Sequence, residues 1–428
     1  MRIFVRRGSK ESSGDVVFEA EKNLLTGEKA FKKQFGELTS LEGDLLLLAS
    51  AIFAADRATP RGDGEEYSRV FELSVQIVNM ARLQPLIRQV ERVLRKLSND
   101  AWRVELRQYD GKQEKLLGVT AKKGKTLLFS GGLDSLAAAI EFGAAPDSGL
   151  RLISHITHNP QTTGAQKSLV QLLSAKDIVL PHLQFLVSSR PVIPTAGLQH
   201  DIENSQRTRS FLFLVLAALT ARRAGHREVL FMAENGQMAI HLPLTEGRIG
   251  ARSTHTAHPD VLSEMQQFLQ ATLDLPICIV NPYVDKTKAE VIKPIWDRLP
   301  EAISVSTSCW KNSRLQGAAT HCGTCIPCYI RRIAIETYGT DTTIYARDPW
   351  RENFSGMSPQ DEARRNLADY SQFMVQISRS SEADLMAEWP ELYSRNLNAQ
   401  SAIEMYKRAA TETRKVWGRY PALAALLT

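Results

Sequence analysis

The middle of the chain alternates short apolar runs with apolar helix-forming stretches. The runs suited to buried strands lie at 126–129, 150–157, 185–187, 229–232 and 276–280. Helix-forming stretches begin near 136 and 211, between these runs. Strands that are apolar along their whole length, with helices between them, are typical of a parallel sheet covered on both faces. We therefore expect an α/β fold built on a parallel sheet, and Cys278 is most simply a buried residue of its last strand.

Residues 1–120 have a different pattern, which predicts a small α+β accessory domain. Its expected strands lie at 2–6, 15–19, 70–78 and 102–107. Its expected helices are an apolar stretch at 41–55 and a second helix with a single apolar face, made by Leu86, Val90, Val93, Leu94 and Leu97. We find no catalytic motif in this part of the chain.

The C-terminal residues, 341–428, predict a helical extension. One helix there has an apolar stripe made by Ile403, Tyr406, Ala410 and Trp417. The expected organisation is therefore an accessory domain at 1–120, a catalytic domain at 121–340 and this extension.

The composition is that of a soluble globular protein. With 428 residues, 43% hydrophobic and 23% charged, the chain has enough apolar surface for two or three domains. The longest apolar run, 211–219, is too short to span a bilayer, and no apolar segment follows the N-terminal arginines. We expect a cytoplasmic protein without a membrane partner. A net charge of +6, with 47 acidic residues interspersed, argues against direct binding of nucleic acid.

A tight turn links the strand at 126–129 to the helix near 136. This phosphate turn consists of Ser130, Gly131, Gly132, Leu133, Asp134 and Ser135. Adjacent glycines let the backbone approach a ligand and expose its N–H groups to phosphate, and the following helix start favours an anion. The serines can donate to phosphate oxygens, and Asp134 can hold Mg²⁺ or cap the helix. The alternative is an ordinary strand-to-helix turn.

Loops after the other strands offer further ligand groups, because ligands of open α/β sheets bind over the carboxyl ends of the strands. His158 is a candidate for contact with adenine or ribose, although an ordinary hydrogen-bonded histidine is the simpler interpretation for it and for His155. Arg209 precedes an apolar helix, where it suits an anionic group, and Ser210 is a good N-cap there. A plain cap with a solvated arginine is the alternative.

Two more segments are candidates for the substrate site. The turn after the strand at 229–232 carries groups that could hydrogen-bond a purine-like edge, at Glu234, Asn235 and Gly236. The loop 246–255 has glycines and arginines without periodicity, and Arg248 or Arg252 could bind a carboxylate. Solvent exposure of these arginines is the alternative.

Thr287, Lys288, Ala289 and Glu290 begin a helix. A lysine in the first helical turn opposes the helix dipole, so it lowers stability unless an anion compensates. Lys288 is therefore a candidate for contact with an anionic ligand.

Four of the five cysteines fall within twenty residues, at Cys309, Cys322, Cys325 and Cys328. Two C-x-x-C steps and a longer loop can surround one Zn²⁺ tetrahedrally and leave no position for water, so we expect a structural site. His321 is a substitute ligand, and redox cysteines or an iron–sulfur cluster are the alternatives.

These motifs resemble a known family. The turn at 130–135 is similar to the PP-loop of N-type ATP pyrophosphatases, and no Lys-Ser or Lys-Thr follows it as in a Walker P-loop. Together with Arg209, the T-K-A-E segment and the cysteine motif ending at Arg331, it resembles 7-cyano-7-deazaguanine synthase, the QueC family. The likeness covers about 120–340 and implies an adenine nucleotide α-hydrolase-like core.

The resemblance implies a chemistry and its cofactors. ATP, Mg²⁺ and Zn²⁺ would be bound, and Lys288 would reach the ATP phosphates. The carboxylate of 7-carboxy-7-deazaguanine would attack the α-phosphate of ATP, pyrophosphate would leave, and ammonia would displace AMP to give an amide. Asp134, Ser135 and Lys288 would carry this catalysis. A second activation could yield a nitrile.

The chain departs from the compact family at several points. It has about 120 additional residues in front, a long helical tail, and Arg209-Ser210 where the family has an Arg-Asn pair. These departures resemble the QueC-like proteins of antiphage operons, of the QatC type. That likeness implies transfer of the activated deazaguanine to another acceptor, such as an amine on a partner protein from the same operon.

Two other functions remain alternatives at this point. A tRNA-modifying PP-loop enzyme would need a stronger basic surface and a catalytic cysteine outside the zinc set, where only Cys278 is left. A non-catalytic nucleotide-binding scaffold would have no need of the serines, Asp134 and Lys288 together.

Overall fold

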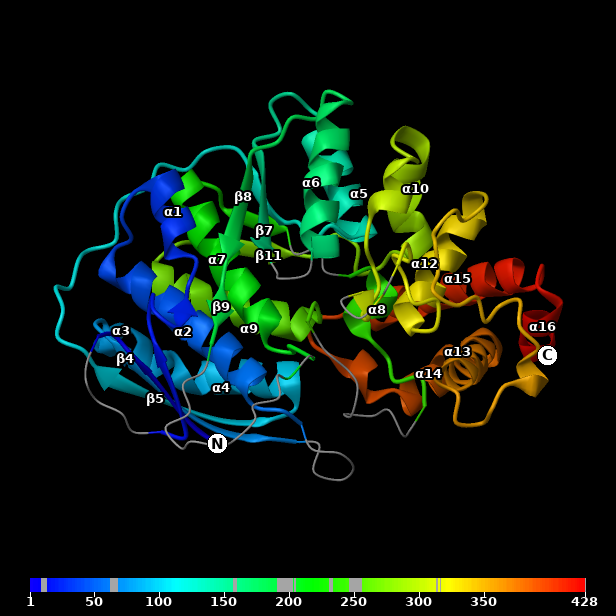
Figure 1. The fold of residues 1–428 in the computed structure, drawn as a ribbon, viewed down its shortest axis with the longest axis horizontal. Helices are drawn as coiled ribbons and strands as arrows, with labels where there is room; N and C mark the ends of the chain where they lie inside the picture. The colour runs from blue at the N-terminus through cyan, green and yellow to red at the C-terminus, as the bar shows by residue number, and fades with distance from the viewer. Residues whose placement is uncertain are drawn as a thin grey trace.

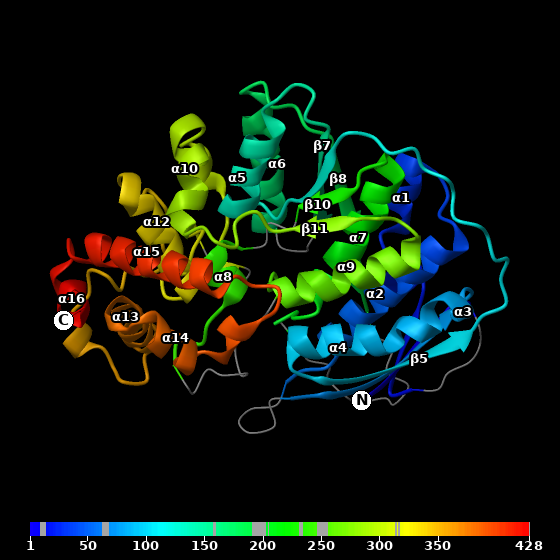
Figure 2. The ribbon, with the colours of Figure 1, turned by 180° about the vertical axis from the view of Figure 1, so that it is seen from behind.

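The computed structural model describes residues 1–8, 14–61, 68–156, 160–190, 203, 205–230, 234–245, 256–312, 315 and 317–427. Figures 1 and 2 show two sheets with helices between them and a group of helices at the far end of the molecule. The mixed α/β architecture with parallel sheets confirms the expected fold class.

The central sheet has five parallel strands in the order β11-β10-β6-β7-β8. Their bounds are Lys125–Leu128 (β6), Leu150–Ile156 (β7), His182–Leu186 (β8), Glu228–Leu230 (β10) and Cys278–Val280 (β11). Each lies at or next to a predicted run. Cys278, however, is exposed. The prediction of a buried thiol was wrong because the residue is the first of an edge strand.

Helices cover both faces of this sheet, as expected for apolar parallel strands. On one face lie α5 (Leu133–Gly143), α6 (Pro160–Ser174) and α10 (Lys288–Arg298), and on the other α7 (Arg209–Ala224) and α9 (Pro259–Leu273). Neighbouring residues of a strand alternate between the two cores. Leu152 packs with the α5 side, and Ile153 packs with the α7 side.

The N-terminal sheet has four parallel strands in the order β2-β1-β4-β5. They are Arg2–Arg6 (β1), Val16–Glu19 (β2), Val70–Ile77 (β4) and Ala101–Gln108 (β5). A two-stranded antiparallel ribbon pairs Leu24–Leu25 (β3) with Ser188–Ser189 (β9). The helices of this region are α1 (Glu28–Phe35), α2 (Ser40–Ala58), α3 (Met80–Leu83), η1 (Gln84–Leu86) and α4 (Ile87–Ser98).

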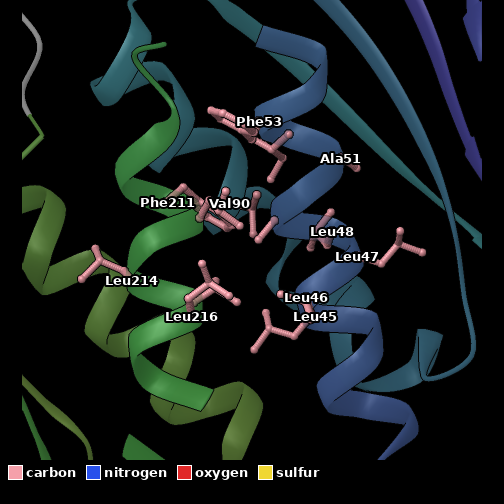
Figure 3. Packing of buried hydrophobic residues seen from close by; sticks show 14 of the residues in the cluster. Leu45, Leu46, Leu47, Leu48, Ala51, Phe53, Val90, Phe211, Leu214 and Leu216 are labelled. Carbon is pink, nitrogen blue, oxygen red and sulfur yellow. The ribbon is translucent and has the colours of Figure 1, made fainter. Parts of the chain in front are cut away.

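The N-terminal sheet and the central sheet share one hydrophobic core. Helices α2 and α4 lie on the first sheet and pack against α7 and α9, which lie on the second. Figure 3 shows this contact, with buried leucines of α2 in one cluster with Phe211 and Leu216 of α7. The layers are also joined by polar contacts, since Arg222 donates to the buried Glu42 at 3.1 Å. The division at residue 120 stays a prediction.

The C-terminal helices form a second core. They are α12 (Ile326–Tyr338), α13 (Glu362–Arg379), α14 (Glu382–Glu388), α15 (Ala399–Trp417) and α16 (Pro421–Ala424). Shorter helical turns are α8 (Gly236–Ile240), α11 (Ala302–Val305), η4 (Phe354–Gly356), η5 (Pro390–Tyr393) and η6 (Ala425–Leu427). All four residues of the predicted stripe on α15 are buried. Within the described part of the chain, no helix combines the length and apolarity that a membrane crossing requires.

Candidate functional site

The phosphate turn lies at the carboxyl end of β6, the middle strand of the central sheet. Helix α5 begins at Leu133 with Gly132 as its N-cap, so Asp134 is not the cap. Gly131 has φ +86°, a conformation that favours glycine. A Cβ on Gly132 would lie 3.1 Å from the carbonyl oxygen of Thr307. Gly131 is therefore favoured by its backbone conformation, and Gly132 is favoured because the backbone of Thr307 approaches it closely.

The two serines of the turn are held by hydrogen bonds at the start of α5. Ser135 Oγ donates to the carbonyl oxygen of Gly132 at 3.0 Å and lies 3.3 Å from Ser130 Oγ. Ser130 Oγ accepts from the Gly132 N–H at 3.3 Å. The hydroxyls are thus fixed beside a helix N-terminus, where free N–H groups and the dipole favour an anion. This cradle fits a phosphate group.

Lys288 and Asp134 form an ion pair across two helix N-termini. Lys288 Nζ lies 2.8 Å from Asp134 Oδ2, and each side chain is 8% exposed. Asp134 supplies the anion that a lysine in the first turn of α10 needs. Asp134 Oδ1 is buried and has no hydrogen-bond partner among the described residues. It is the oxygen with which this carboxylate would hold Mg²⁺.

Glu234 and Arg209 belong to the same electrostatic environment. Burial and the charge of Asp134 raise the pKa of Glu234 to about 8, against the opposing effects of Lys288 and Arg209. The Arg209 side chain is exposed, and its guanidinium lies 5.5 Å from the centre of the Phe213 ring. Three other predicted site residues, Asp134, Lys288 and Arg209, therefore lie close enough to Glu234 to influence its pKa.

Helix α8 carries the next two predicted residues. Asn235, its N-cap, is 1% exposed, and its Oδ1 has no hydrogen-bond partner among the described residues. A Cβ on Gly236 would lie 2.4 Å from the carbonyl oxygen of Val284 and 2.8 Å from Met405 Cε. Gly236 thus allows close packing of α8, while Asn235 keeps a free acceptor.

The remaining predictions fall into two groups. His158, Arg248 and Arg252 lie outside the described residues. His155 is an ordinary hydrogen-bonded histidine, as expected, because its Nε2 lies 3.0 Å from the Val187 carbonyl oxygen.

The prediction of Ser210 as the N-cap of α7 was wrong. The helix begins two residues earlier, at Arg209, and Thr208 is its N-cap. The Thr208 hydroxyl does not cap the helix either, because it donates to Asp56 Oδ2 at 2.9 Å. A contact with a distant helix, invisible in the local sequence, decides this boundary.

The four cysteines form a compact cluster. Their sulfur atoms lie within 4.8 Å of one another, and all four side chains are buried. Cys325 Sγ is 3.4 Å from Cys328 Sγ, which is 3.8 Å from Cys322 Sγ. Four sulfurs about 2.3 Å from one Zn²⁺ would be about 3.8 Å apart in a tetrahedron. The cluster therefore fits a structural zinc site.

Backbone N–H groups support the thiolates. Cys309 Sγ accepts from the N–H groups of Lys311 and Cys322, both at 3.3 Å. Such bonds favour the charged sulfur that a metal needs. His321 is not a ligand here, since its Nε2 accepts from the Ser308 N–H at 3.1 Å and its Nδ1 lies 2.9 Å from Thr320 Oγ1.

The segment around Cys309 connects the cysteine cluster to the phosphate turn. The Thr307 N–H donates to the Gly131 carbonyl oxygen at 3.0 Å. Asn312 Nδ2 donates to Thr307 Oγ1 at 3.1 Å and to Thr162 Oγ1 of α6 at 3.2 Å. The cysteine cluster and its neighbouring segment therefore brace one side of the turn.

Sequence reasoning missed several residues that hold the site. Thr287 donates to Glu412 Oε1 of α15 at 2.7 Å. Tyr406, also on α15, donates to the Gln237 carbonyl oxygen at 3.1 Å and accepts from the Leu242 N–H at 3.2 Å. Only the apolar stripe on α15 hinted at a buried helix. Its polar contacts join segments more than a hundred residues apart, so no local pattern could reveal them.

Comparison with known proteins adds one finding. Residues 225–339 match the family model described as queuosine biosynthesis protein QueC. No curated protein matches the chain. The matched range includes Glu234, Lys288 and the four cysteines, while the phosphate turn precedes it. The chain therefore carries a QueC-family domain in residues 225–339.

Proposed function

We propose that this protein is an ATP-dependent enzyme that adenylates a carboxylate of the 7-carboxy-7-deazaguanine type and couples it to nitrogen. The observation that carries this proposal is the Lys288–Asp134 ion pair of 2.8 Å beside the diglycine turn. Together, the turn and the ion pair provide a phosphate-binding cradle, a cation that would stabilise the charge on the leaving pyrophosphate, and a carboxylate that would hold Mg²⁺. A QueC-like domain indicates an ATP-using PP-loop enzyme.

The proposed reaction has two steps, adenylation of the carboxylate and transfer of the acyl group to nitrogen. A substrate carboxylate oxygen bonds to the α-phosphorus of ATP while the bond to the β-phosphate oxygen breaks, which gives an acyl-adenylate and pyrophosphate. The nitrogen of ammonia or an amine then bonds to the acyl carbon, AMP leaves with its oxygen, and the amine loses a proton. Activation is needed because oxide is a poor leaving group.

The chain's own groups support the first step. The N–H groups of the turn and the Lys288 ammonium would stabilise the charge that develops on the leaving pyrophosphate. Bound Mg²⁺ would share this charge. The half-buried Glu234, with its raised pKa, can donate a hydrogen bond to the substrate at neutral pH.

The acceptor is the finer part of the proposal. The chain extends well beyond the matched range on both sides, and its N-terminal region and C-terminal helices pack on the core. These additions support an enzyme of the antiphage QueC-like group that transfers the deazaguanine acyl group to an amine of a partner protein. Ammonia is the alternative acceptor.

The location of Cys278 argues against the tRNA-modifying alternative. The residue pairs with Glu228 at the amino end of the central sheet. The phosphate turn follows β6 at the opposite, carboxyl end. The only cysteine outside the cluster therefore lies at the wrong edge for chemistry at the turn, although its thiol is exposed.

The reaction can be tested with ATP labelled at the α-phosphate and 7-carboxy-7-deazaguanine. We expect labelled AMP and unlabelled pyrophosphate, formed only when both substrates are present. The Asp134→Ala variant should lose turnover while keeping its fold and zinc, with a lower stability because Lys288 is left without its partner. Formation of ADP and phosphate would contradict the proposed cleavage, and full activity of the variant would remove Asp134 from it.

A further inference from the structure

Trp310 differs from the other tryptophans of the chain. Its side chain is 54% exposed, whereas four of the other five are buried and Trp296 is half-buried. Single exposed apolar side chains are common on protein surfaces, so exposure alone indicates no function. The position and rigidity of Trp310 are what set it apart.

The backbone around Trp310 is held on both sides. Before it, Thr307 is hydrogen-bonded to the phosphate turn, and Cys309 belongs to the cysteine cluster. After it, the Lys311 N–H donates to Cys309 Sγ, and the Lys311 ammonium pairs with Glu362 of α13. A large indole is therefore presented to solvent from a fixed segment. Little conformational entropy would be lost when a ligand covers it.

Trp310 also lies between two parts of the site. It is three residues from Thr307, which contacts Gly131. Its ring centre is 6.4 Å from that of His241, the C-cap of α8. At the other end of α8, which is five residues long, the buried Oδ1 of Asn235 has no hydrogen-bond partner among the described residues. An aromatic face and an unpaired acceptor thus flank the same short helix.

We propose that Trp310 is the stacking wall of the acid-binding subsite, where it covers one face of a planar, bicyclic heteroaromatic ring. Asn235 Oδ1 accepts a hydrogen bond from an N–H group on the edge of that ring. This inference rests on the proposed function and adds a specificity-determining residue to it. Stacking selects a flat aromatic acid, and the acceptor selects a ring edge that carries hydrogen-bond donors.

The test compares Trp310→Ala and Trp310→Phe with Tyr393→Ala, which removes another exposed aromatic side chain, 65% exposed, on η5. Calorimetry would measure the affinity of each variant for 7-carboxy-7-deazaguanine, guanine and ATP. We expect Trp310→Ala to weaken binding of the two bicyclic ligands about 5- to 150-fold. ATP affinity, zinc content and melting temperature should stay near those of the wild type.

Fluorescence supplies a readout that a purely structural role would not change. Either bicyclic ligand should quench the emission of exposed Trp310 in the wild type, and the quenching should be lost in Trp310→Phe, which keeps most of the affinity. If the acid is adenylated normally by Trp310→Ala, the stacking wall is refuted while the proposed function stands. If guanine binding depends on Trp310 but the acid is never adenylated, the stacking role of Trp310 is supported and the proposed function is refuted. If neither bicyclic ligand binds the wild type, the wall is refuted.

Discussion

Thr287 donates its hydroxyl proton to Glu412 at 2.7 Å, while the same oxygen accepts from the Glu290 N–H at 3.2 Å. The N-cap of α10 is therefore held by a helix that comes 125 residues later. Arg408 adds a second link, since its Nε lies 2.7 Å from Glu290 Oε1. Through these contacts α15 positions the helix turn that carries Lys288.

Glu412→Gln should change how stability depends on pH. Burial raises the pKa of Glu412 to about 7, against the Thr287 hydrogen bond, which lowers it. The folded carboxyl thus binds its proton more tightly than the unfolded one, so its stabilising contribution is present below about pH 4.5 and is lost as the pH rises to 7. The full effect is at most about 3 kcal/mol. Melting temperatures from pH 5 to 8 should fall more steeply for the wild type than for the variant.

The matched control is Glu404→Gln, which changes an exposed carboxylate on the same helix. It should keep the wild-type pH profile. Parallel profiles for all three proteins would show that Glu412 has an ordinary pKa.

Lys288→Gln should reduce pyrophosphate release about 10²- to 10³-fold, because it removes a cation aimed at developing charge. It also leaves Asp134 buried without its partner, which lowers stability. The double variant Lys288→Gln/Asp134→Asn avoids that unpaired charge and should fold well while remaining inactive. Lys293→Gln, which removes an exposed lysine from the same helix, should stay active. Activity in the double variant would exclude the ion pair from catalysis.

Glu234→Gln should remove an alkaline loss of nucleotide binding. The raised pKa, about 8, means that Glu234 is mostly neutral at pH 7 and becomes charged above pH 8. A new negative charge beside Asp134 would then repel the phosphates of ATP. The folded state also prefers the protonated carboxyl, so this contribution to stability is lost as the pH rises from about 4.5 through 8. ATP affinity measured by calorimetry from pH 6.5 to 9 should decline in the wild type and stay flat in the variant.

Cys325→Ser should lower zinc content and melting temperature together. A structural zinc site contributes folding free energy directly, and one lost thiolate weakens it. Cys278→Ser provides the control, because that thiol is exposed and outside the cluster. Metal analysis of the purified proteins should give one zinc per chain for the wild type and for Cys278→Ser. Equal zinc in Cys325→Ser would show that the cluster has another role.

Local patterns in the sequence predict the central strands, the phosphate turn and the cysteine cluster, because each lies within a short stretch of the chain. The parallel pairing of β1 with β2 has no local signal, since both strands also suit a hairpin. The exposure of Cys278 follows from its place in an edge strand, which strand propensity does not encode. The cap of α7 depends on Asp56, about 150 residues earlier in the chain.

The hydrophobic core that α2 shares with α7 limits where this chain can be truncated. Removing the first 120 residues would strip α7 and α9 of their apolar covering and leave Arg222 and Arg223 without the buried carboxylate of Glu42. We expect the remainder to be less stable and less soluble, because this apolar surface would then face water. The front of this chain is thus not a detachable module, because its helices complete the apolar core of the central sheet.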